Sequence, residues 1–339
     1  MNEAGVPLLK VDNLRTYIPS RRGIVHAVDG VSFELHTGKT LAIAGESGCG
    51  KSVLCRTIMG LPPEKARICK GSSIRFNGKQ LIGLRENGYR RLRATRMAMI
   101  FQDPFSSLHP MMTIGRQISE SMCHHLKMNR RQAQERVVGL IRAVGLSGPD
   151  KFTRLYPHQL SGGMRQRIAI AIALACDPEL LIADEPTTAL DVTVQAGILA
   201  LLNNLQAERK MTIIMVTHNL GVASNVADRI AVMYAGKIVE TAPASDLFTR
   251  PNHPYTKALI DSVPRIDQSS HRPLFSIKGG PYDPVNPLTG CRFSTRCPKA
   301  KDLCRSREPM LKADPGNNHF RACWYPLRDD VHDRFTFNC

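Results

Sequence analysis

A glycine-rich turn within residues 40–61 constrains the fold of this chain more than any other feature of its sequence. The apolar run 41–44 before the turn is predicted to be a buried strand, and a helix is expected from Lys51 to residue 61. The turn has the pattern G-x-x-x-x-G-K-S, formed by Gly45, Glu46, Ser47, Gly48, Cys49, Gly50, Lys51 and Ser52. The backbone N–H groups of such a turn and the positive end of the helix dipole bind phosphate, while the lysine reaches the β- and γ-phosphates and the serine hydroxyl ligates Mg²⁺. The turn therefore predicts a nucleotide phosphate site.

Two acidic residues, Asp184 and Glu185, directly follow the apolar run 180–183, which is predicted to be a buried parallel strand. A carboxylate at the carboxyl end of a strand beside a phosphate loop can hold Mg²⁺, and we expect this of Asp184. The next residue, Glu185, can point at the γ-phosphate and polarise an attacking water. The pair predicts the hydrolytic part of the same site.

Two further polar side chains follow predicted strands. Gln102 comes after the apolar run 97–101, and His218 comes after the apolar run 211–217. Because parallel strands end at one edge of a sheet, we expect both side chains at the edge that holds the phosphate loop. This shared position favours a functional role for His218 over that of an ordinary structural histidine.

The pattern becomes helical from residue 104 to about residue 157. Within it, residues 131–144 have apolar side chains at the spacing of one helix face, and Gly145 can cap the helix end. A second glycine turn follows, in which Ser161 can cap a helix while Gly162 and Gly163 leave room for an anion. That turn predicts either a second phosphate-binding helix N-terminus or an ordinary capped helix.

The first 35 residues contain two predicted strands, residues 8–16 and 28–35, which indicate a small antiparallel sheet before the phosphate loop. Tyr17, at the end of the first strand, could stack on a nucleotide base, because aromatic faces bind π-systems. A surface or edge-strand tyrosine is the alternative. Later in the chain, residues 229–234 and 237–241 predict a hairpin around Ala235 and Gly236.

The composition limits the class of protein. A chain of 339 residues suggests two domains, and 42% hydrophobic with 22% charged residues is typical of a soluble globular protein. No run approaches the roughly 18–20 apolar residues of a membrane span, and the N-terminus lacks a signal peptide, so a cytosolic chain is expected. The net charge of +17 indicates an anionic partner, such as nucleic acid, an anionic membrane surface or a nucleotide. The alternative is that the charge has no specific partner, since many soluble ATPases are basic.

These motifs occur together in an order that resembles the nucleotide-binding subunits of ABC transporters, over residues 8–245. They comprise the Walker A sequence GESGCGKS, the Gln-loop at Gln102, the signature LSGGMRQR, the Walker B sequence LLIADE, the D-loop at Leu190-Asp191 and the switch histidine His218. The resemblance implies an α/β fold, a P-loop NTPase with a RecA-like core and a mostly parallel sheet. It also implies an antiparallel β subdomain and an inserted α-helical subdomain at about 104–165.

The resemblance further implies the roles of the site residues. The catalytic residues would be Lys51, Gln102, Glu185 and His218, with Glu185 as the base and His218 holding the γ-phosphate. The Mg²⁺ ligands would be Ser52, Gln102 and Asp184. Besides the residues of the Walker A sequence, the ATP-binding residues would be Tyr17, Ser161, Gly162, Gly163 and Asp191.

In this family two subunits close head to tail, so that each signature turn completes the ATP site of its partner. The expected partners are a second ABC ATPase subunit, two transmembrane permease subunits and, indirectly, a substrate-binding protein. Because the subfamily often uses two different ATPases, the second ATPase subunit is expected to be a different chain. No nucleic acid partner is expected. The expected location is peripheral, on the cytoplasmic face of the bacterial inner membrane. The position of the family's adenine-stacking aromatic aligns with Ile18, beside Tyr17, and this departure affects base recognition.

The C-terminal part narrows the subfamily. Residues 251–264 and the later cysteines resemble the C-terminal region of ATPases from oligopeptide, dipeptide and nickel importers. Cys291, Cys297, Cys304 and Cys323 follow the pattern C-x5-C-P-x5-C-x18-C and are a candidate tetrathiolate site. Zinc sites more often contain C-x2–4-C pairs, and the Cys-Pro step is found in iron–sulfur ligation. The resemblance implies a [4Fe–4S] cluster, while zinc, free thiols or a redox disulfide stay as alternatives.

The predicted domains are a nucleotide-binding domain at 1–250, a helix and proline-rich linker at 251–290, and a cysteine-rich region at 291–339. The expected function is ATP hydrolysis that powers the import of di- and oligopeptides. The alternative is a soluble ABC-type ATPase acting on nucleic acid or ribosomes. Against it, the chain has no second ATPase cassette and no aromatic–basic platform for stacking bases.

Overall fold

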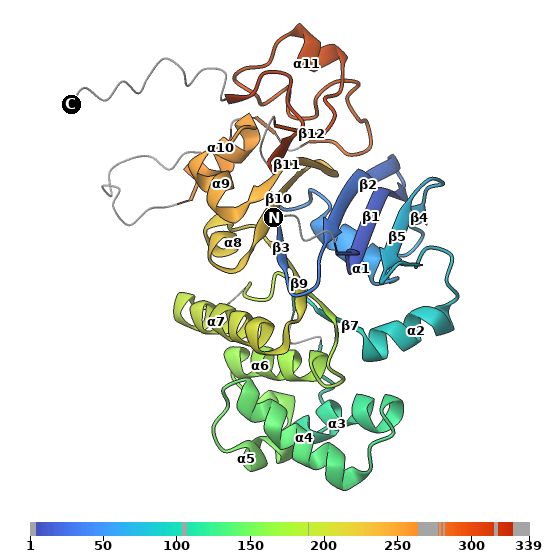
Figure 1. The fold of residues 1–339 in the computed structure, drawn as a ribbon, viewed down its shortest axis with the longest axis vertical. Coiled ribbons are helices and arrows are strands. Elements are labelled where there is room, and N and C mark those ends of the chain that lie inside the picture. The colour runs from blue at the N-terminus through green and yellow to red at the C-terminus, as the bar shows by residue number, and fades with distance from the viewer. Residues whose placement is uncertain are drawn as a thin grey trace, which may run out of the picture. The chain divides into compact units, whose positions relative to one another are not determined.

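The computed structural model describes residues 5–103, 107–188, 190–263, 277, 279–280, 282–314 and 318–327. The chain divides into two compact units, and Figure 1 labels most of their helices and strands. The first unit comprises the chain up to Leu9, Leu35–Thr40 and Phe76–Val216. The second comprises Lys10–Glu34, Leu41–Arg75 and the chain from Thr217 onward. Each unit therefore combines segments that are far apart in the sequence.

Three parallel strands form the sheet of the first unit: β7 (Met97–Ile100), β8 (Leu180–Asp184) and β9 (Thr212–Thr217). In their register Met97 lies opposite Leu180, and Leu180 lies opposite Thr212. Every residue of β8 and β9 is buried, as is usual for parallel strands that are covered on both faces. The common direction brings the carboxyl ends of the three strands to one edge.

Helices make up most of the rest of the first unit. They are α2 (Glu86–Thr95), α3 (Ile114–His125), α4 (Arg130–Ala143), α5 (Pro149–Arg154), a 3₁₀ turn (Pro157–Gln159), α6 (Gly162–Ala173) and α7 (Val192–Arg209), with a short strand β6 (Lys79–Gln80) before α2. Helices α3 to α6 pack on one another. In α4, Asn129 and Gln132 form a capping box, Val137 and Leu140 are buried, and Gly145 follows the helix end with a φ of 73°. The predicted helical insertion is confirmed.

The second unit contains an antiparallel sheet in the order β2 (Gly23–Leu35), β1 (Leu9–Ser20), β5 (Ser73–Phe76), with β4 (Arg67–Ile68) paired to β1. It also contains β3 (Thr40–Ala44), which runs parallel to β10 (Arg229–Tyr234). The predicted hairpin is confirmed, because β10 turns at Ala235 and Gly236 into the antiparallel β11 (Lys237–Pro243). Both turn residues have positive φ, 49° and 84°.

The C-terminal part extends this second sheet. Strand β13 (Phe320–Arg321) pairs antiparallel with β11, and β12 (Lys312–Ala313) pairs with β13. The helices are α8 (Leu220–Val226), α9 (Ala244–Thr249), α10 (Pro254–Asp261) and α11 (Asp302–Ser306). Tyr255 of α10 and Phe293 are buried in one apolar cluster with Ala42 of β3 and Val232 of β10. The cysteine-rich segment thus shares a core with the strand that leads into the phosphate loop.

One predicted helix is shorter in the structure, and one predicted segment lies mostly outside the described residues. Helix α1 (Lys51–Ile58) ends before residue 61, because Gly60 takes a φ of 68° and ends the helical turn. Much of the predicted proline-rich linker, residues 264–276 together with 278 and 281, lies outside the described residues. Among the helices that the structure describes, none has the length and apolar character required to cross a bilayer.

Candidate functional site

The phosphate loop, residues 45–50, joins β3 to α1 in the second unit. Gly50 has a φ of 105°, and a Cβ atom there would lie 2.0 Å from the Ala27 carbonyl oxygen. A Cβ atom on Gly45 would lie 2.1 Å from the Met233 carbonyl oxygen. Both positions therefore require glycine, because backbone atoms cannot move aside for a side chain.

Lys51 begins α1 and is only 3% exposed. Its Nζ donates to the carbonyl oxygens of Gly45, at 2.8 Å, and Glu46, at 2.9 Å. The ammonium group thus lies inside the loop that it is predicted to serve. This arrangement concentrates positive charge where backbone N–H groups and the start of a helix already favour an anion.

Glu46 is held by residues that the sequence did not predict for this site. Its backbone N–H donates to the Tyr255 hydroxyl at 2.9 Å, and its carboxylate pairs with the Arg296 guanidinium. Arg296 directly precedes Cys297. The only sequence signal is thus its place within the cysteine pattern, and nothing local links it to the loop.

The two carboxylates predicted for the site lie in the first unit. Asp184 is the last residue of β8 and is 1% exposed. Glu185 takes a φ of 48°, which is uncommon for a residue other than glycine, and its N–H donates to the Val216 carbonyl oxygen at 3.1 Å. Its Oε2 accepts from the Thr188 hydroxyl at 2.9 Å and lies 3.3 Å from Nε2 of Gln102. Three predicted site residues, Gln102, Asp184 and Glu185, are therefore together at the carboxyl edge of the sheet.

The signature turn packs against the segment after β8. Ser161 caps α6 by accepting from the Met164 N–H at 3.3 Å, and Asp191 caps α7 by accepting from the Val194 N–H at 2.8 Å. A Cβ atom on Gly163 would lie 2.8 Å from Cγ1 of Val194. The glycine therefore also has a packing role, since it lets the start of α6 approach the start of α7.

His218 and Tyr17 belong to the second unit. His218 follows β9 and is exposed, and the next residue, Asn219, caps α8. The Tyr17 hydroxyl donates to Asp29 at 2.7 Å, and its ring lies 4.1 Å from the His26 ring, centroid to centroid. Burial, followed by the hydrogen bond to Asp29, raises the pKa of Tyr17. The roles of both residues toward ATP stay predictions.

Comparison with known proteins agrees with this geometry. Residues 28–188 match the family model described as "ABC transporter", and residues 239–304 match "Oligopeptide/dipeptide transporter, C-terminal region". The oligopeptide transport ATP-binding protein AppD of Bacillus subtilis is 46% identical over 318 residues, 94% of this chain and 97% of the relative. The dipeptide transport ATP-binding protein DppD of Escherichia coli is 43% identical over 95% of this chain and 98% of the relative.

The chain belongs to the ABC transporter ATP-binding proteins. Among solved structures, a dimeric ATP-binding cassette in a post-hydrolysis state with ADP and Pi is similar with a TM-score of 0.63. It is 26% identical, and the match covers 70% of this chain and 98% of that one. The family resemblance, the P-loop NTPase fold and the ATPase activity expected from the motifs are confirmed.

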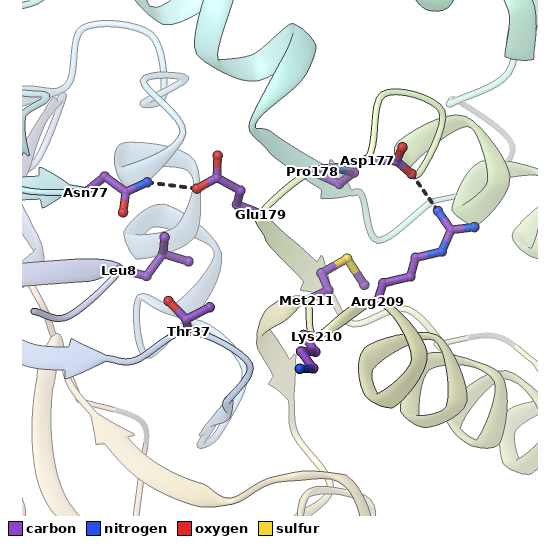
Figure 2. A pocket seen from close by; sticks show the side chains of 9 residues that line it. All are labelled: Leu8, Thr37, Asn77, Asp177, Pro178, Glu179, Arg209, Lys210 and Met211. Carbon is purple, nitrogen blue, oxygen red and sulfur yellow. Dashed lines mark hydrogen bonds and ion pairs between the residues drawn. The ribbon is translucent and has the colours of Figure 1, made fainter. Parts of the chain in front are cut away.

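The described part of this ABC ATPase includes a cavity of about 330 Å³ that the sequence did not predict. Figure 2 shows its lining, with Asp177 turned toward Arg209 and Asn77 toward Glu179. These pairs are 2.9 Å and 2.8 Å apart, and Glu179 also binds Arg96. Because the cavity adjoins the amino ends of β8 and β9, it lies at the edge opposite Asp184.

The predicted cysteine site forms a second, much smaller cavity in the second unit. It is lined by Cys291, Cys297, Cys304 and Cys323, together with His253, Phe293 and Trp324. Burial raises the pKa of Cys291 to about 11 and that of Cys323 to about 12, and the neighbouring cysteines add to both shifts. Within the described ranges, no three His, Cys, Asp or Glu side chains are grouped as a metal-binding set. The four thiols converge, but the cluster expected from the sequence is not established.

Proposed function

We propose that this ABC ATPase powers the import of short peptides through a membrane transporter. The observation that carries the proposal is the oligopeptide/dipeptide C-terminal region at residues 239–304, which follows the ATPase cassette in the same chain. Relatives named for oligopeptide transport and for dipeptide transport match nearly the whole chain at 43–46% identity. Peptides are therefore the cargo class that we assign.

We assign the catalytic roles to the residues predicted from the sequence. Lys51 binds the β- and γ-phosphates, Glu185 orients the attacking water as the base, and His218 holds the γ-phosphate. Ser52, Gln102 and Asp184 would hold Mg²⁺, which neutralises phosphate charge. The buried Asp184 carboxylate and its neighbour Gln102, which contacts Glu185, suit this role.

The signature turn acts on the ATP of a second ATPase subunit. Closure of the two subunits requires the γ-phosphate, and hydrolysis removes that bridge, so ATP shifts the population between open and closed dimers. We further propose that the second subunit is a different chain, that two permease subunits bind the pair at the cytoplasmic membrane face, and that a substrate-binding protein delivers the peptide. Gln102 links ATP occupancy to the permeases.

We also propose that the four cysteines bind a [4Fe–4S] cluster, with zinc as the alternative. The observation in favour is that all four thiols line one small cavity, where a bound metal cation would stabilise their thiolate forms. Iron, acid-labile sulfide and zinc measured on protein purified without oxygen test the assignment. Four irons and four sulfides per chain would support the cluster, whereas one zinc or no metal would contradict it.

Affinity purification of the tagged chain from detergent-solubilised membranes, followed by peptide uptake into vesicles containing the purified complex, tests the transport proposal. We expect two membrane-spanning proteins, a second ATPase, and ATP-dependent uptake of a labelled dipeptide or oligopeptide. Glu185→Gln should abolish uptake without dispersing the complex. Recovery of ribosomes or nucleic acid without membrane proteins would instead support the alternative function, and uptake of nickel complexes alone would contradict the peptide cargo.

A further inference from the structure

An ion pair joins the phosphate loop to the cysteine-rich segment within the second unit. Nη1 of Arg296 lies 2.7 Å from one carboxylate oxygen of Glu46, and Nη2 lies 3.0 Å from the other. The Arg296 side chain is 7% exposed, and that of Glu46 is 32% exposed. A guanidinium that binds both carboxylate oxygens in a half-buried place fixes the position of its partner more strictly than a single surface contact does.

The main chain of Glu46 is held as well. Its N–H donates to the Tyr255 hydroxyl, and its carbonyl oxygen accepts from Lys51. Tyr255 is fully buried, and its ring packs on those of Tyr234 and Phe293 at centroid distances of 4.6 Å and 5.3 Å. One loop residue is therefore held through its side chain, its N–H and its carbonyl oxygen.

Arg296 is itself fixed on both sides. It lies over the Tyr234 ring, 5.9 Å from the centroid, and Nη2 donates to the Ile277 carbonyl oxygen at 3.3 Å. Its backbone N–H closes a turn by donating to the Phe293 carbonyl oxygen at 3.0 Å. Because Phe293 is part of the apolar core, the backbone that positions the Arg296 guanidinium against Glu46 is itself held in place.

A second arginine makes a parallel connection. Arg292, which directly follows Cys291, is 6% exposed, pairs with Asp29 and donates to the Ala235 carbonyl oxygen. The Asp29 N–H donates to the Gly236 carbonyl oxygen, and the Gly236 N–H donates to the carbonyl oxygen of Cys49 in the phosphate loop, both at 2.9 Å. Residues 292 and 296, which flank the turn between two cysteines, thus connect to opposite ends of the loop.

We propose that Arg296 is a positioning residue for ATP. By binding Glu46 it holds the phosphate loop in the conformation that wraps the phosphates, and it neutralises a carboxylate that would otherwise repel the triphosphate. The cysteine-rich segment then stabilises the conformation of the phosphate loop at the ATP site. This inference uses the ATPase activity of the family but not the peptide cargo or the nature of any group bound by the cysteines.

The effect should appear in ATP affinity. With Arg296→Gln, we expect the Kd for AMP-PNP with Mg²⁺ to rise about tenfold, since hydrogen bonds between charged groups are worth that much or more. We expect kcat at saturating ATP to stay within about twofold, because the binding energy of the nucleotide restores the loop conformation. Arg296→Lys keeps the charge but loses the two-pronged contact, and it should give an intermediate Kd.

The decisive measurement is a double-mutant cycle on the full chain, with Kd measured by titration calorimetry. If Arg296 acts through Glu46, Arg296→Gln should change Kd at least fivefold less in a Glu46→Gln background than in the wild type. Equal changes in both backgrounds would overturn the proposal, as would an unchanged Kd in Arg296→Gln. If that variant fails to fold, Arg296→Lys completes the same cycle.

Arg305→Gln is the matched control. Arg305 also adjoins a cysteine, but its side chain is 69% exposed and lies 3.5 Å from Asp302 of α11. We expect this variant to bind AMP-PNP as the wild type does, and loss of affinity there would indicate a general effect of charge and contradict the specific role of Arg296. Peptide uptake by the intact transporter separates the positioning role of Arg296 from the proposed transport function. A wild-type complex that hydrolyses ATP but moves no peptide would refute only the transport function.

Discussion

Nε2 of Gln102 lies 3.3 Å from Oε2 of Glu185, and both residues follow the carboxyl ends of strands β7 and β8. The same oxygen accepts a hydrogen bond from Thr188 at 2.9 Å. The proposed base is therefore oriented by two groups. Movement of Gln102 would alter the contacts of the Glu185 carboxylate. The proposed role of Gln102, which is to link ATP occupancy to the permeases, is therefore physically coupled to the proposed role of Glu185 in hydrolysis.

Glu185→Gln should lower the hydrolysis rate by about 10²- to 10⁴-fold, the usual contribution of a general base. ATP binding should persist, because the amide keeps the shape of the side chain, and an ATP-bound closed dimer should accumulate. Single-turnover hydrolysis and size-exclusion chromatography with Mg²⁺ and ATP measure both effects. Glu208→Gln, an exposed carboxylate on α7 of the same unit, is the control and should hydrolyse ATP normally. A normal rate in Glu185→Gln would remove Glu185 from the mechanism.

Gly163→Ala should destabilise the first unit by about 1–3 kcal/mol, because the new methyl group would meet the stiff side chain of Val194. Adding Val194→Ala should restore most of the lost stability. Urea unfolding of the single and double variants tests this pair. Gly139→Ala in α4 is the control, since a Cβ there meets nothing within 4 Å and should be neutral or stabilising. Equal stability of Gly163→Ala and the wild type would contradict the packing role.

Glu240→Gln should destabilise the pairing of the C-terminal strand β13. The Glu240 carboxylate is fully buried, accepts from the N–H groups of Asn252 and His253, at 2.6 Å and 2.9 Å, and lies 2.6 Å from Nε2 of His319. The amide has only one oxygen acceptor for these donors, and each buried hydrogen-bonding group that loses its partner costs about 1–3 kcal/mol. Hydrogen exchange should show faster exchange in β13, whereas Glu34→Gln, whose exposed carboxylate pairs with Lys10, should change stability by less than about 1 kcal/mol. Unaltered exchange in β13 would refute the anchoring role.

Asp29→Asn should show a pH-dependent loss of stability. Burial alone pushes the pKa of Asp29 up, but the Tyr17 hydroxyl, Lys237 and Arg292 outweigh it and hold the pKa below its ordinary value. The stabilisation by the ionised group is therefore complete above about pH 4 and is lost as the pH falls through the lowered pKa. In urea unfolding, Asp29→Asn should be less stable than the wild type at pH 7, and the two stabilities should converge as the pH falls through the lowered pKa of Asp29. A constant difference across this range would contradict the assignment.

Much of the fold was predictable because its signals are local. The phosphate loop is specified by two glycines with no space for a side chain, and the strand before it by a short apolar run. The hairpin at Ala235 and the helix that begins after Asn129 follow from turn and capping residues that act within a few positions. The placement of Gln102 and Glu185 at one edge follows from the common direction of parallel strands.

Contacts between distant segments were not predictable in this way. The sequence around Arg296 has no hydrophobic periodicity and no motif that predicts its pairing with Glu46, which lies 250 positions earlier. The same holds for Glu240 and His319, 79 positions apart, and for the fit of Gly163 against Val194. Such pairs depend on how strands and helices pack, and packing is decided by shape and burial across the whole unit.

The sequence by itself determined the chemistry of this protein: the phosphate loop, the acidic pair after β8, the signature turn and the family to which they belong. These features depend on residue types at fixed short spacings, and the backbone geometry they impose is local. Only the tertiary structure decided that the cysteine-rich segment shares a core with the strand before the phosphate loop and holds Glu46 through Arg296. Burial brings those groups together and makes their charge pairing effective, and no short stretch of sequence specifies either.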